Sequence, residues 1–289
     1  MITSATGIVR DPVFEAIKTN ASLTIRDGTV SAPGDAVQRF PPRLALFCIW
    51  SDPINPEASE RPGKSFVNFE LFLILATGVA APIFHVLFEK PGAIHSKDLQ
   101  KSFEIAKAKN LNLSVMFQNR YSPEIKIIKE HIAKGYFGRI MSAEARTVTS
   151  QVRYRNPKHW LFNKKQSGSG ILSWLGCHYL DLLCYVLNDQ VVEVSAMVEN
   201  LNEENLEVED TAILALKFSE GTIGSLHAGY QLAGSPPGYS GGLYDSHFSI
   251  RGTSGYGTIP SNKNTYKFYS EKEEMNLAGI QTMEFSPGR

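Results

Sequence analysis

The stretch His85-Val86-Leu87-Phe88-Glu89-Lys90-Pro91 ends a short apolar run in an acid, a base and a proline. Val86 to Phe88 predict a buried strand, and the charged pair then lies at the carboxyl end of that strand, where open α/β sheets bind ligands. Pro91 has no N–H group and restricts Lys90 to extended geometry, and the bond between them is a candidate for the cis form. The side chain of Lys90 is therefore aimed in a restricted direction, which suits a residue that handles protons.

The segment after Pro91 continues this strand into a parallel unit. Ser96 is the expected N-cap of a helix that runs to about Lys109. The alternation of apolar residues from Leu111 to Phe117 predicts a second strand. A strand, a helix and a strand in this order predict two parallel neighbours in one sheet.

A further helix begins at Pro123, a residue type favoured at the first helical position. Ser122 precedes it as the expected N-cap, and Gly135 marks the end of the helix. We place a domain boundary near Arg120, between the parallel unit and this helix.

The second half of the chain is patterned mainly as β-structure. A helix from about Gly176 to Leu187 interrupts it, the stretches Ser219–Gly221 and Gly252–Gly255 are typical turns, and the tail after Gly257 is polar and poorly patterned. Segments rich in β-branched and aromatic residues predict strands, most of them antiparallel, over residues 139–150, 191–199, 212–218, 222–230 and 246–251.

These elements predict an α/β chain of two domains. Residues 1–120 form an incomplete Rossmann-like parallel domain in this prediction. Residues 121–289 form an α+β domain with a large, mostly antiparallel sheet.

The first seventy residues are harder to interpret. Asp11 to Asn20 is a candidate helix, and Leu44 to Trp50 is a candidate strand. The stretches Asp27–Arg43 and Ser51–Gly63 are rich in Pro, Gly, Ser and Asp and predict loops, while Phe69–Val79 fits a helix or a strand.

No targeting or membrane segment is expected. The first thirty residues carry scattered charges and no continuous apolar core, so they do not resemble a secretory signal. Leu71 to Phe84 is apolar but falls short of the roughly 20 residues that span a bilayer, so buried core is the favoured interpretation. Membrane attachment through this segment is kept as the weakest alternative.

The composition excludes several classes of partner. Lys plus Arg balances Asp plus Glu at 29 each, and no basic run with interleaved aromatics occurs, so nucleic acid is not expected as a partner. The cysteines Cys48, Cys177 and Cys184 form no Cys-x-x-Cys pair, which suits a reducing compartment such as the cytoplasm. The dispersed histidines contain no His-Glu-x-x-His pair, and no metal site is expected.

Several motifs follow Glu89-Lys90-Pro91 in a consistent order. Together they resemble the glucose-fructose oxidoreductase and inositol dehydrogenase family of nicotinamide-dependent sugar and polyol oxidoreductases. The resemblance covers roughly residues 84–230, and beyond Glu-Lys-Pro it rests on Phe117–Pro123, Lys134–Ile140, Gly168–Leu172 and Gly176–Asp181.

The resemblance implies that Lys90 and His178 are the catalytic residues. Oxidising an alcohol requires a base within hydrogen-bond reach of the hydroxyl while hydride leaves the carbon. A free lysine has a pKa of about 10.4, which burial or a nearby cation lowers, and a histidine titrates near pH 6.5. Two structural alternatives stay open: Lys90 pairs with Glu89 or another acid, and His178 is a core histidine that bonds to Asp181 on its own helix.

The resemblance also implies a substrate-binding set of Arg120, Tyr121, Trp160 and Asp181. Arg120 and Tyr121 follow the second strand of the parallel pair, and in the family this segment borders the nicotinamide and the substrate. The alternative for this pair is an ion pair at the domain boundary, and the alternative for Trp160 is an aromatic that covers a core.

The implied cofactor is NAD or NADP, with contacts from Gly7, Glu89, Lys90, Pro91 and Arg120. A dinucleotide site normally has Gly-x-Gly-x-x-Gly between a first strand and helix, and this chain has no such motif. Gly7 is a candidate remnant, so the nucleotide half looks truncated or rebuilt. A second departure is Trp174, which stands four residues before His178, where the family usually has an aspartate.

Two functions follow as hypotheses. The first is an oxidoreductase that transfers hydride between the nicotinamide and a sugar or polyol hydroxyl. The second is a catalytically impaired member of the family that serves as a binding or assembly module, which the missing glycine motif and Trp174 favour. A homodimer or homotetramer, formed through the open face of the sheet, is expected by analogy with the family.

Overall fold

The computed structural model describes residues 85–149, 159–233, 244–260, 265–272 and 279–285, together with the backbone of four short strands before residue 47. The helix expected over Asp11–Asn20, the loop at Ser51–Gly63 and the apolar segments Phe69–Val79 and Leu71–Phe84 lie outside the described residues. The chain divides into two compact units, one of Ile2–Met116 with the last two residues and one of Phe117–Pro287 with Met1. The two domains predicted on either side of Arg120 remain a prediction.

The N-terminal unit contains the expected parallel strands. The order of its sheet is β4 (Leu44–Leu46), β5 (His85–Glu89) and β6 (Leu113–Met116), and both pairs of neighbours are parallel. Helix α3 (Ser96–Ala108) connects β5 to β6, as the sequence predicted. Ser96 is the first helical residue rather than the cap, because His95 before it has the extended backbone of an N-cap.

Three short strands of this unit were not predicted. β1 (Thr24–Arg26), β2 (Thr29–Ser31) and β3 (Gln38–Arg39) pair antiparallel, so the expectation of loops throughout Asp27–Arg43 was wrong for β2 and β3. Arg26 pairs with Thr29, and the Asp-Gly dipeptide between them in the sequence is the strongest short signal for a hairpin.

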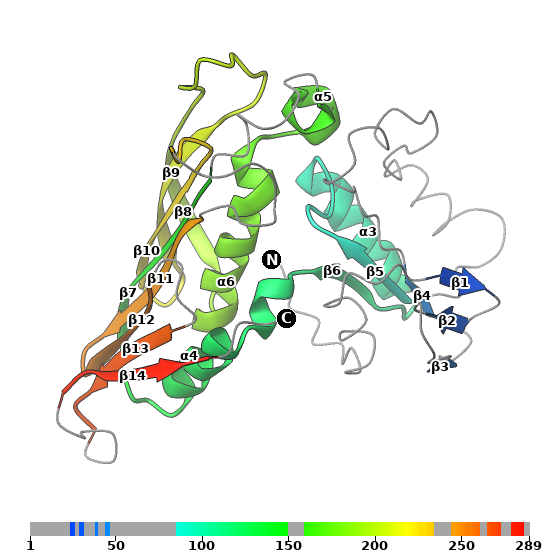
Figure 1. Cartoon of the computed structure of the whole chain (residues 1–289). Helices are drawn as coiled ribbons and strands as arrows, with labels where there is room; N and C mark the ends of the chain where they lie inside the picture. The colour runs from blue at the N-terminus through cyan, green and yellow to red at the C-terminus, as the bar shows by residue number, and fades with distance from the viewer. Residues whose placement is uncertain are drawn as a thin grey trace. The chain divides into compact units, whose positions relative to one another are not determined.

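The C-terminal unit is built on an eight-stranded sheet (Figure 1). All neighbouring strands are antiparallel except β7 and β10, so the predicted large, mostly antiparallel sheet is confirmed. In spatial order the strands are β14 (Gln281–Glu284), β13 (Thr265–Ser270), β12 (Gly255–Ile259), β11 (Asp245–Gly252), β7 (Ile140–Val148), β10 (Ile223–Gly229), β9 (Thr211–Phe218) and β8 (Val191–Glu199).

The tail after Gly257 is more regular than the sequence analysis expected. It contributes the end of β12 and the strands β13 and β14. Along β13 the side chains of Tyr266 and Phe268 are buried in the core, while Lys267 between them is exposed. This alternation is present in the sequence, and the polar residues around it concealed it.

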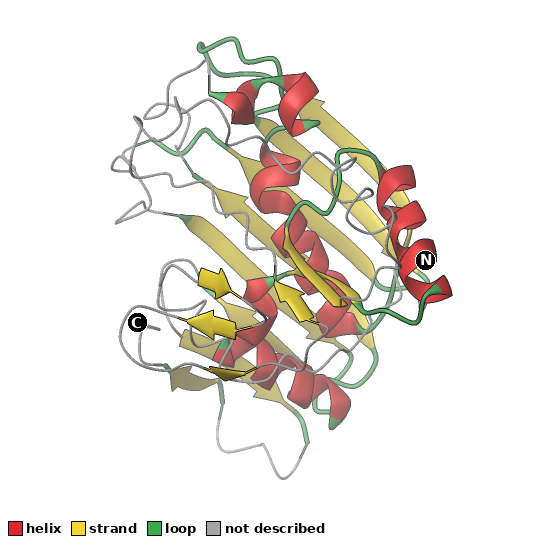
Figure 2. Cartoon of the chain, turned by 90° about the vertical axis from the view of Figure 1, so that its right-hand side faces the viewer, coloured by secondary structure: helices red, strands yellow, loops and turns green. Residues whose placement is uncertain are grey.

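Two helices cover one face of this sheet (Figure 2). Helix α4 (Pro123–Ala133) has Ser122 at its N-cap and Pro123 at its start, as predicted, and Gly135 after it has a positive φ of 71° that glycine adopts without strain. Helix α6 (Cys177–Leu187) continues directly from a π-helical turn, η5 (Leu172–Gly176). Three shorter helices are η2 (Gln118–Tyr121), η4 (Trp160–Phe162) and α5 (Lys164–Ser167).

The main core lies between these helices and the sheet. Ile128 of α4 and Leu183 of α6 are fully buried, and they belong to one cluster with sheet residues such as Leu216, Phe248 and Ile250. Full burial of such a side chain contributes about 1.5–3 kcal/mol to stability.

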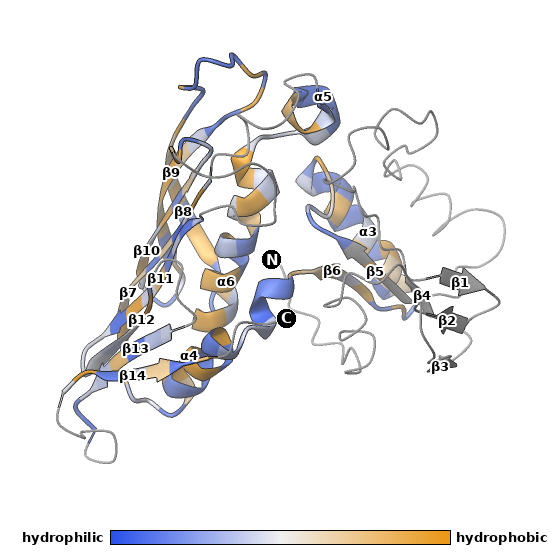
Figure 3. Ribbon diagram, viewed as in Figure 1, coloured by the Kyte–Doolittle hydropathy of each residue, from blue (hydrophilic) through white to orange (hydrophobic). Residues whose placement is uncertain are grey.

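The stretch Lys164–Leu187 is long and apolar enough to cross a membrane by length and composition, and the apolar character of α6 is visible in Figure 3. Its buried residues Leu182, Leu183 and Val186 instead pack in the core beneath the sheet, as expected for the central helix of a globular domain. This helix is therefore accounted for without a membrane.

A histidine is buried in the same core. The ring of His131 is 5% exposed, its Nδ1 lies 3.0 Å from the hydroxyl of Tyr266 in a hydrogen bond, and the rings of Phe137 and Phe268 surround it. Burial lowers the pKa of this imidazole, while Glu130 and Lys134 beside it on α4 act in opposite directions. The folded protein therefore favours the neutral ring.

We expect the stability to fall in mild acid. The unfolded chain protonates His131 below about pH 6.5, whereas the folded chain does so only at lower pH, so stability is retained above that pH and lost as the pH falls. His131→Gln should show a smaller drop in unfolding free energy between about pH 7.5 and pH 5.5 than the unchanged protein, measured by urea denaturation. His227 and His247, whose pKa values burial also lowers, contribute to the same loss of stability. An unchanged pH dependence in the variant would contradict this assignment.

Candidate active site

The short helix η2 places Arg120 against α6. The Nε atom of Arg120 donates a hydrogen bond of 2.7 Å to Oδ2 of Asp181, and its terminal amino group donates to Oδ1. The side chain of Asp181 is 9% exposed and that of Arg120 is 28% exposed, so the pair is largely shielded from water. Such a two-point contact fixes the plane of the guanidinium relative to the carboxylate.

The charges of this pair affect one another's titration. Burial raises the pKa of the Asp181 carboxyl, and the hydrogen bonds from Arg120 counter that rise. The same hydrogen bonds raise the pKa of Arg120. Arg120 therefore forms an ion pair, which was the alternative to a role in substrate binding. Its partner is Asp181, which was itself predicted to bind substrate.

Aromatic rings hold the guanidinium of Arg120 from two sides. Its central carbon lies 4.9 Å from the ring centre of Tyr185 and 5.6 Å from that of Phe117. Lys129 of α4 approaches the same Tyr185 ring to 3.7 Å and donates a hydrogen bond to the Tyr185 carbonyl oxygen. Burial, followed by the charge of Arg120, lowers the pKa of this lysine.

His178 belongs to the same neighbourhood. Its ring is 5% exposed and meets the ring of Phe117 edge-on, with 5.9 Å between the ring centres. Phe117 therefore contacts both Arg120 and His178. Although Asp181 stands one turn from His178 on α6, both of its oxygens accept hydrogen bonds from Arg120, so the expected histidine–aspartate bond is not the main contact of this carboxylate.

A second aromatic group stands one turn before His178. Trp174, in the π-helical turn η5, meets Trp160 of η4 edge-to-face with 6.0 Å between ring centres, and His159 lies 5.4 Å from Trp160. Both indoles are half-buried and pack on a smaller core cluster that includes Phe162 and Tyr230. Trp160 therefore packs on a core together with Trp174, and its predicted place in the substrate wall stays a prediction. Short π-helical turns often occur at functional sites.

The helix that carries His178 starts from a loop held by a single carboxylate. Glu209 accepts hydrogen bonds from the backbone N–H groups of Gly170 and Leu172 and from the hydroxyl of Ser169. A side chain at Gly170 would lie 1.9 Å from the carbonyl oxygen of Glu209, so only glycine permits this approach. Glu209 satisfies amides that the start of a helix leaves without partners.

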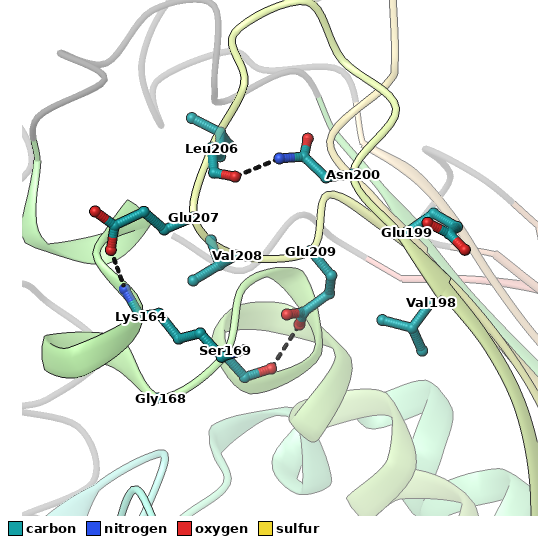
Figure 4. Close-up of a pocket in the computed structure, with 10 residues that line it drawn as sticks. All are labelled: Lys164, Gly168, Ser169, Val198, Glu199, Asn200, Leu206, Glu207, Val208 and Glu209. Atoms are coloured by element: carbon teal, nitrogen blue, oxygen red, sulfur yellow. Dashed lines mark hydrogen bonds between the residues drawn. The ribbon is translucent and has the colours of Figure 1, made fainter.

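The same carboxylate lines a cavity of about 250 Å³ (Figure 4). Figure 4 shows Glu209 bonded to Ser169, and Glu207 bonded to the backbone of Lys164. These acids already serve to hold the loop that leads into α6. None of the predicted site residues lines this cavity, and we do not assign it to the reaction.

Tyr121 follows Arg120 in η2 and adds to the rise in the pKa of Arg120. Its ring is 39% exposed, and Lys126 lies 5.9 Å from the ring centre. Its predicted role in substrate binding stays a prediction.

The cofactor residues named from the sequence belong to the N-terminal unit, apart from Arg120. Glu89 ends β5, Lys90 follows it at the carboxyl edge of the parallel sheet, and the bond between Lys90 and Pro91 is cis. Burial raises the pKa of the Glu89 carboxyl, and the charge and backbone N–H of Lys90 counter the rise. Gly7 lies outside the described residues. The convergence of Lys90 and His178 therefore stays a prediction.

Sequence reasoning missed three residues of the cluster around Arg120, namely Phe117, Lys129 and Tyr185. Phe117 begins one of the family-like motifs, so its place next to Arg120 was a usable signal. Lys129 and Tyr185 are brought to the site only by the packing of α4 on α6. Within the described ranges, no three His, Cys, Asp or Glu side chains are grouped closely enough to hold a metal ion.

The pair of Arg120 and Asp181 should be measurably coupled. In a double-mutant cycle with Arg120→Ala and Asp181→Ala, we expect a coupling energy of roughly 1–3 kcal/mol in chemical unfolding, because two charge-assisted hydrogen bonds are shielded from water. The same cycle on the exposed pair of Lys134 and Glu130 is the control and should give clearly less coupling. Equal coupling in the two cycles would show that the shielding of Asp181 has no effect.

Comparison with protein families finds one model that matches. The GFO/IDH/MocA C-terminal domain matches residues 125–257. This range contains most of α4, the whole of η5 and α6, and much of the large sheet.

Curated relatives include proteins named as sugar and polyol dehydrogenases. The levoglucosan dehydrogenase of Pseudarthrobacter phenanthrenivorans is 25% identical over 167 residues, which is 50% of this chain and 43% of the relative. The myo-inositol 2-dehydrogenase of Thermotoga maritima is 27% identical over 199 residues, which is 66% of this chain and 56% of the relative. The chain spans about half the length of the curated relatives it matches.

Solved structures share the fold. A putative oxidoreductase from Thermotoga maritima aligns with a TM-score of 0.63 and 20% identity over 77% of this chain and 63% of that one. A levoglucosan dehydrogenase in complex with NADH and levoglucosan aligns with a TM-score of 0.61 and 23% identity over 71% of this chain and 55% of that one. Residues 125–257 are therefore similar to the C-terminal domain of the Gfo/Idh/MocA family.

Proposed function

We propose that this protein is a nicotinamide-dependent oxidoreductase that transfers hydride between NAD or NADP and a hydroxyl group of a sugar or polyol. The observation that carries the proposal is the cluster of Arg120, Asp181, Phe117 and His178. Asp181 and His178 lie on α6, inside the range 125–257 that matches the Gfo/Idh/MocA C-terminal domain, and Phe117 and Arg120 lie just before that range. Relatives named as sugar and polyol dehydrogenases support the substrate class.

In this proposal each residue has a separate role. Lys90 accepts the proton of the substrate hydroxyl, and His178 holds that hydroxyl or shares its proton. Arg120, fixed by Asp181 and by the ring of Tyr185, orients the segment that leads from β6 into α4. Trp160 and Trp174 form an apolar wall that keeps water away from the reacting carbon. When bound, the nicotinamide supplies the hydride acceptor or donor.

The residues at the edge of the parallel sheet fit a nicotinamide. Lys90 stands at the carboxyl end of β5, the position at which open parallel sheets bind nucleotides, and it is half-buried next to a carboxyl group whose pKa burial raises. The sequence has no Gly-x-Gly-x-x-Gly motif to receive the pyrophosphate, so we expect weak cofactor binding.

A second candidate function rests on the Trp174 contact. An indole in edge-to-face contact with Trp160 occupies the place where the family usually has a carboxylate, and it removes one hydrogen-bond acceptor from a polyol site. A binding or assembly module without turnover is the function that this change favours. We also propose, by analogy with the family, a homodimer or homotetramer formed through the open face of the sheet, and a cytoplasmic location.

Replacing Lys90 tests the enzyme proposal. Lys90→Ala should abolish turnover of sugars and polyols with either NAD or NADP, because it removes the proposed base. The melting temperature should stay nearly unchanged, because Lys90 does not belong to a hydrophobic core cluster. Lys97→Ala, an exposed lysine on α3, is the matched control and should keep full activity. Turnover unaltered by Lys90→Ala would end the catalytic assignment, and absence of cofactor binding at millimolar concentration would favour the binding module.

Restoring the carboxylate tests the role of Trp174. If Trp174 lies against the substrate, Trp174→Asp should raise activity towards polyols relative to less hydroxylated sugars. The reason is that a buried carboxylate can accept a hydrogen bond from an additional substrate hydroxyl. Trp174→Phe keeps an aromatic ring and should leave that ratio near its starting value. The measurement is the ratio of kcat/KM for the two substrate classes, and an equal ratio in all three proteins would show that position 174 is remote from the substrate.

A further inference from the structure

The helix that carries His178 has its first amides bonded to a side chain from far along the chain. Helix α6 continues directly from η5, and the N–H of Trp174 bonds to the carbonyl oxygen of Gly170, so the helical run starts there. The carboxylate of Glu209 accepts hydrogen bonds from the N–H of Gly170 at 2.7 Å and from that of Leu172 at 3.1 Å. Amides in the first turn have no partner within their own helix. Glu209 therefore acts as the cap of this helix, although it stands just before β9.

The backbone around Glu209 makes this attachment rigid. The carbonyl oxygen of Glu209 accepts a hydrogen bond of 3.2 Å from the N–H of Ile171, and a side chain on Gly170 would collide with that same oxygen. The next residue, Asp210, is fully buried, and its carboxylate accepts hydrogen bonds from the N–H of Leu201. The carboxylate that caps the helix thus comes from a backbone segment that is itself held in place.

The helix contains a π-helical turn between this cap and His178. In η5 the N–H of Cys177 donates to the carbonyl oxygen of Leu172, five residues back, where a regular α-helix bonds four residues back. The carbonyl oxygen four residues back, that of Ser173, accepts a hydrogen bond of 3.0 Å from the thiol of Cys177. One extra residue in a turn rotates everything that follows by about 100° relative to what precedes it. The direction of His178 therefore depends on where the helix starts.

The far end of α6 is held by a charge of the opposite sign. Lys129 of α4 donates a hydrogen bond to the carbonyl oxygen of Tyr185, in the last turn of the helix. A carboxylate at the first turn and an ammonium at the last turn both suit the dipole of a helix. Directional contacts at the two ends fix the helix along its own axis, which apolar burial defines less sharply because it is non-directional.

We propose that Glu209 is the positioning residue of His178. Through the capped start of the helix and the π-helical turn, it holds the imidazole beside the ring of Phe117, with 5.9 Å between the ring centres. The inference rests on the proposed function only for what His178 does to a substrate. The placement of the imidazole is a property of the free protein and is tested there.

NMR of the free protein tests the placement without turnover. The ring signals of His178, assigned by their loss in His178→Gln, depend on the neighbouring ring of Phe117. Glu209→Ala removes every side-chain acceptor at the start of the helix and should shift these signals. It should also change the near-ultraviolet circular dichroism of the paired indoles of Trp160 and Trp174. Glu209→Gln keeps one carbonyl oxygen, so it should cause smaller changes in both measurements.

Glu207→Ala is the matched control. Glu207 stands two residues before Glu209 and lines the same cavity, but it accepts a hydrogen bond from the N–H of Lys164 in α5. This change should leave the signals of His178 in place. Signals that stay unshifted in Glu209→Ala, or that shift equally in Glu207→Ala, would overturn the proposal, as would a variant that loses only stability. If Glu209→Ala does not fold, Glu209→Gln is judged by the same criteria.

Kinetics connect the placement to the reaction. With a sugar or polyol and either NAD or NADP, Glu209→Ala should lower kcat about tenfold or more, because a small misplacement of a group at the reacting hydroxyl slows the chemical step. KM for the cofactor should stay within about twofold, and Glu209→Gln should give an intermediate kcat. If the unchanged protein has no turnover, the enzyme proposal fails while NMR still decides the role of Glu209. If it turns over and Glu209→Ala matches its kcat, the positioning role fails and the enzyme proposal stands.

Discussion

The burial of α4 and α6 against one face of the eight-stranded sheet is the constraint on which the C-terminal unit depends. Fully buried side chains from both helices, such as Ile128 and Leu183, share one core with the sheet. Because the two helices are held together in this way, Lys129 of α4 and Tyr185 of α6 can meet, and Arg120 is held beside them. The same packing keeps His178 in place next to Phe117. The candidate site is thus a consequence of the core.

The contact between Arg120 and Asp181 gives this region its charge pattern. A shielded ion pair contributes little net stability when compared with apolar residues, but it fixes the geometry of its partners and is costly to break on one side. Both carboxylate oxygens of Asp181 are occupied by Arg120, so we regard Asp181 as a residue that positions Arg120. His178 lies one turn before Asp181 on the same helix, and Trp174 one turn before His178 packs against Trp160.

Prediction from the sequence succeeded where a local signal, such as a capping residue, agreed with a periodic pattern that buries one face of the element. The parallel strands β5 and β6, the start of α4 at Pro123 and the central helix α6 all follow clear periodicity or capping residues. It failed for β13, where polar residues hid the alternation, and for β14, whose side chains do not alternate in burial. It also failed for β2 and β3, where turn-forming residues were interpreted as loops. Short strands have little propensity of their own, and their formation depends on pairing with a neighbour.

The sequence by itself determined the type of each long element and the large, mostly antiparallel sheet, because periodicity and residue type are local properties. It also predicted Lys90, Arg120 and His178 as site residues. The tertiary structure decided the partners. That Asp181 bonds to Arg120, that Trp174 meets Trp160, and that β8 forms the edge of the sheet all depend on residues far apart in the chain. Such contacts are set by how the elements pack, and packing depends on the whole fold.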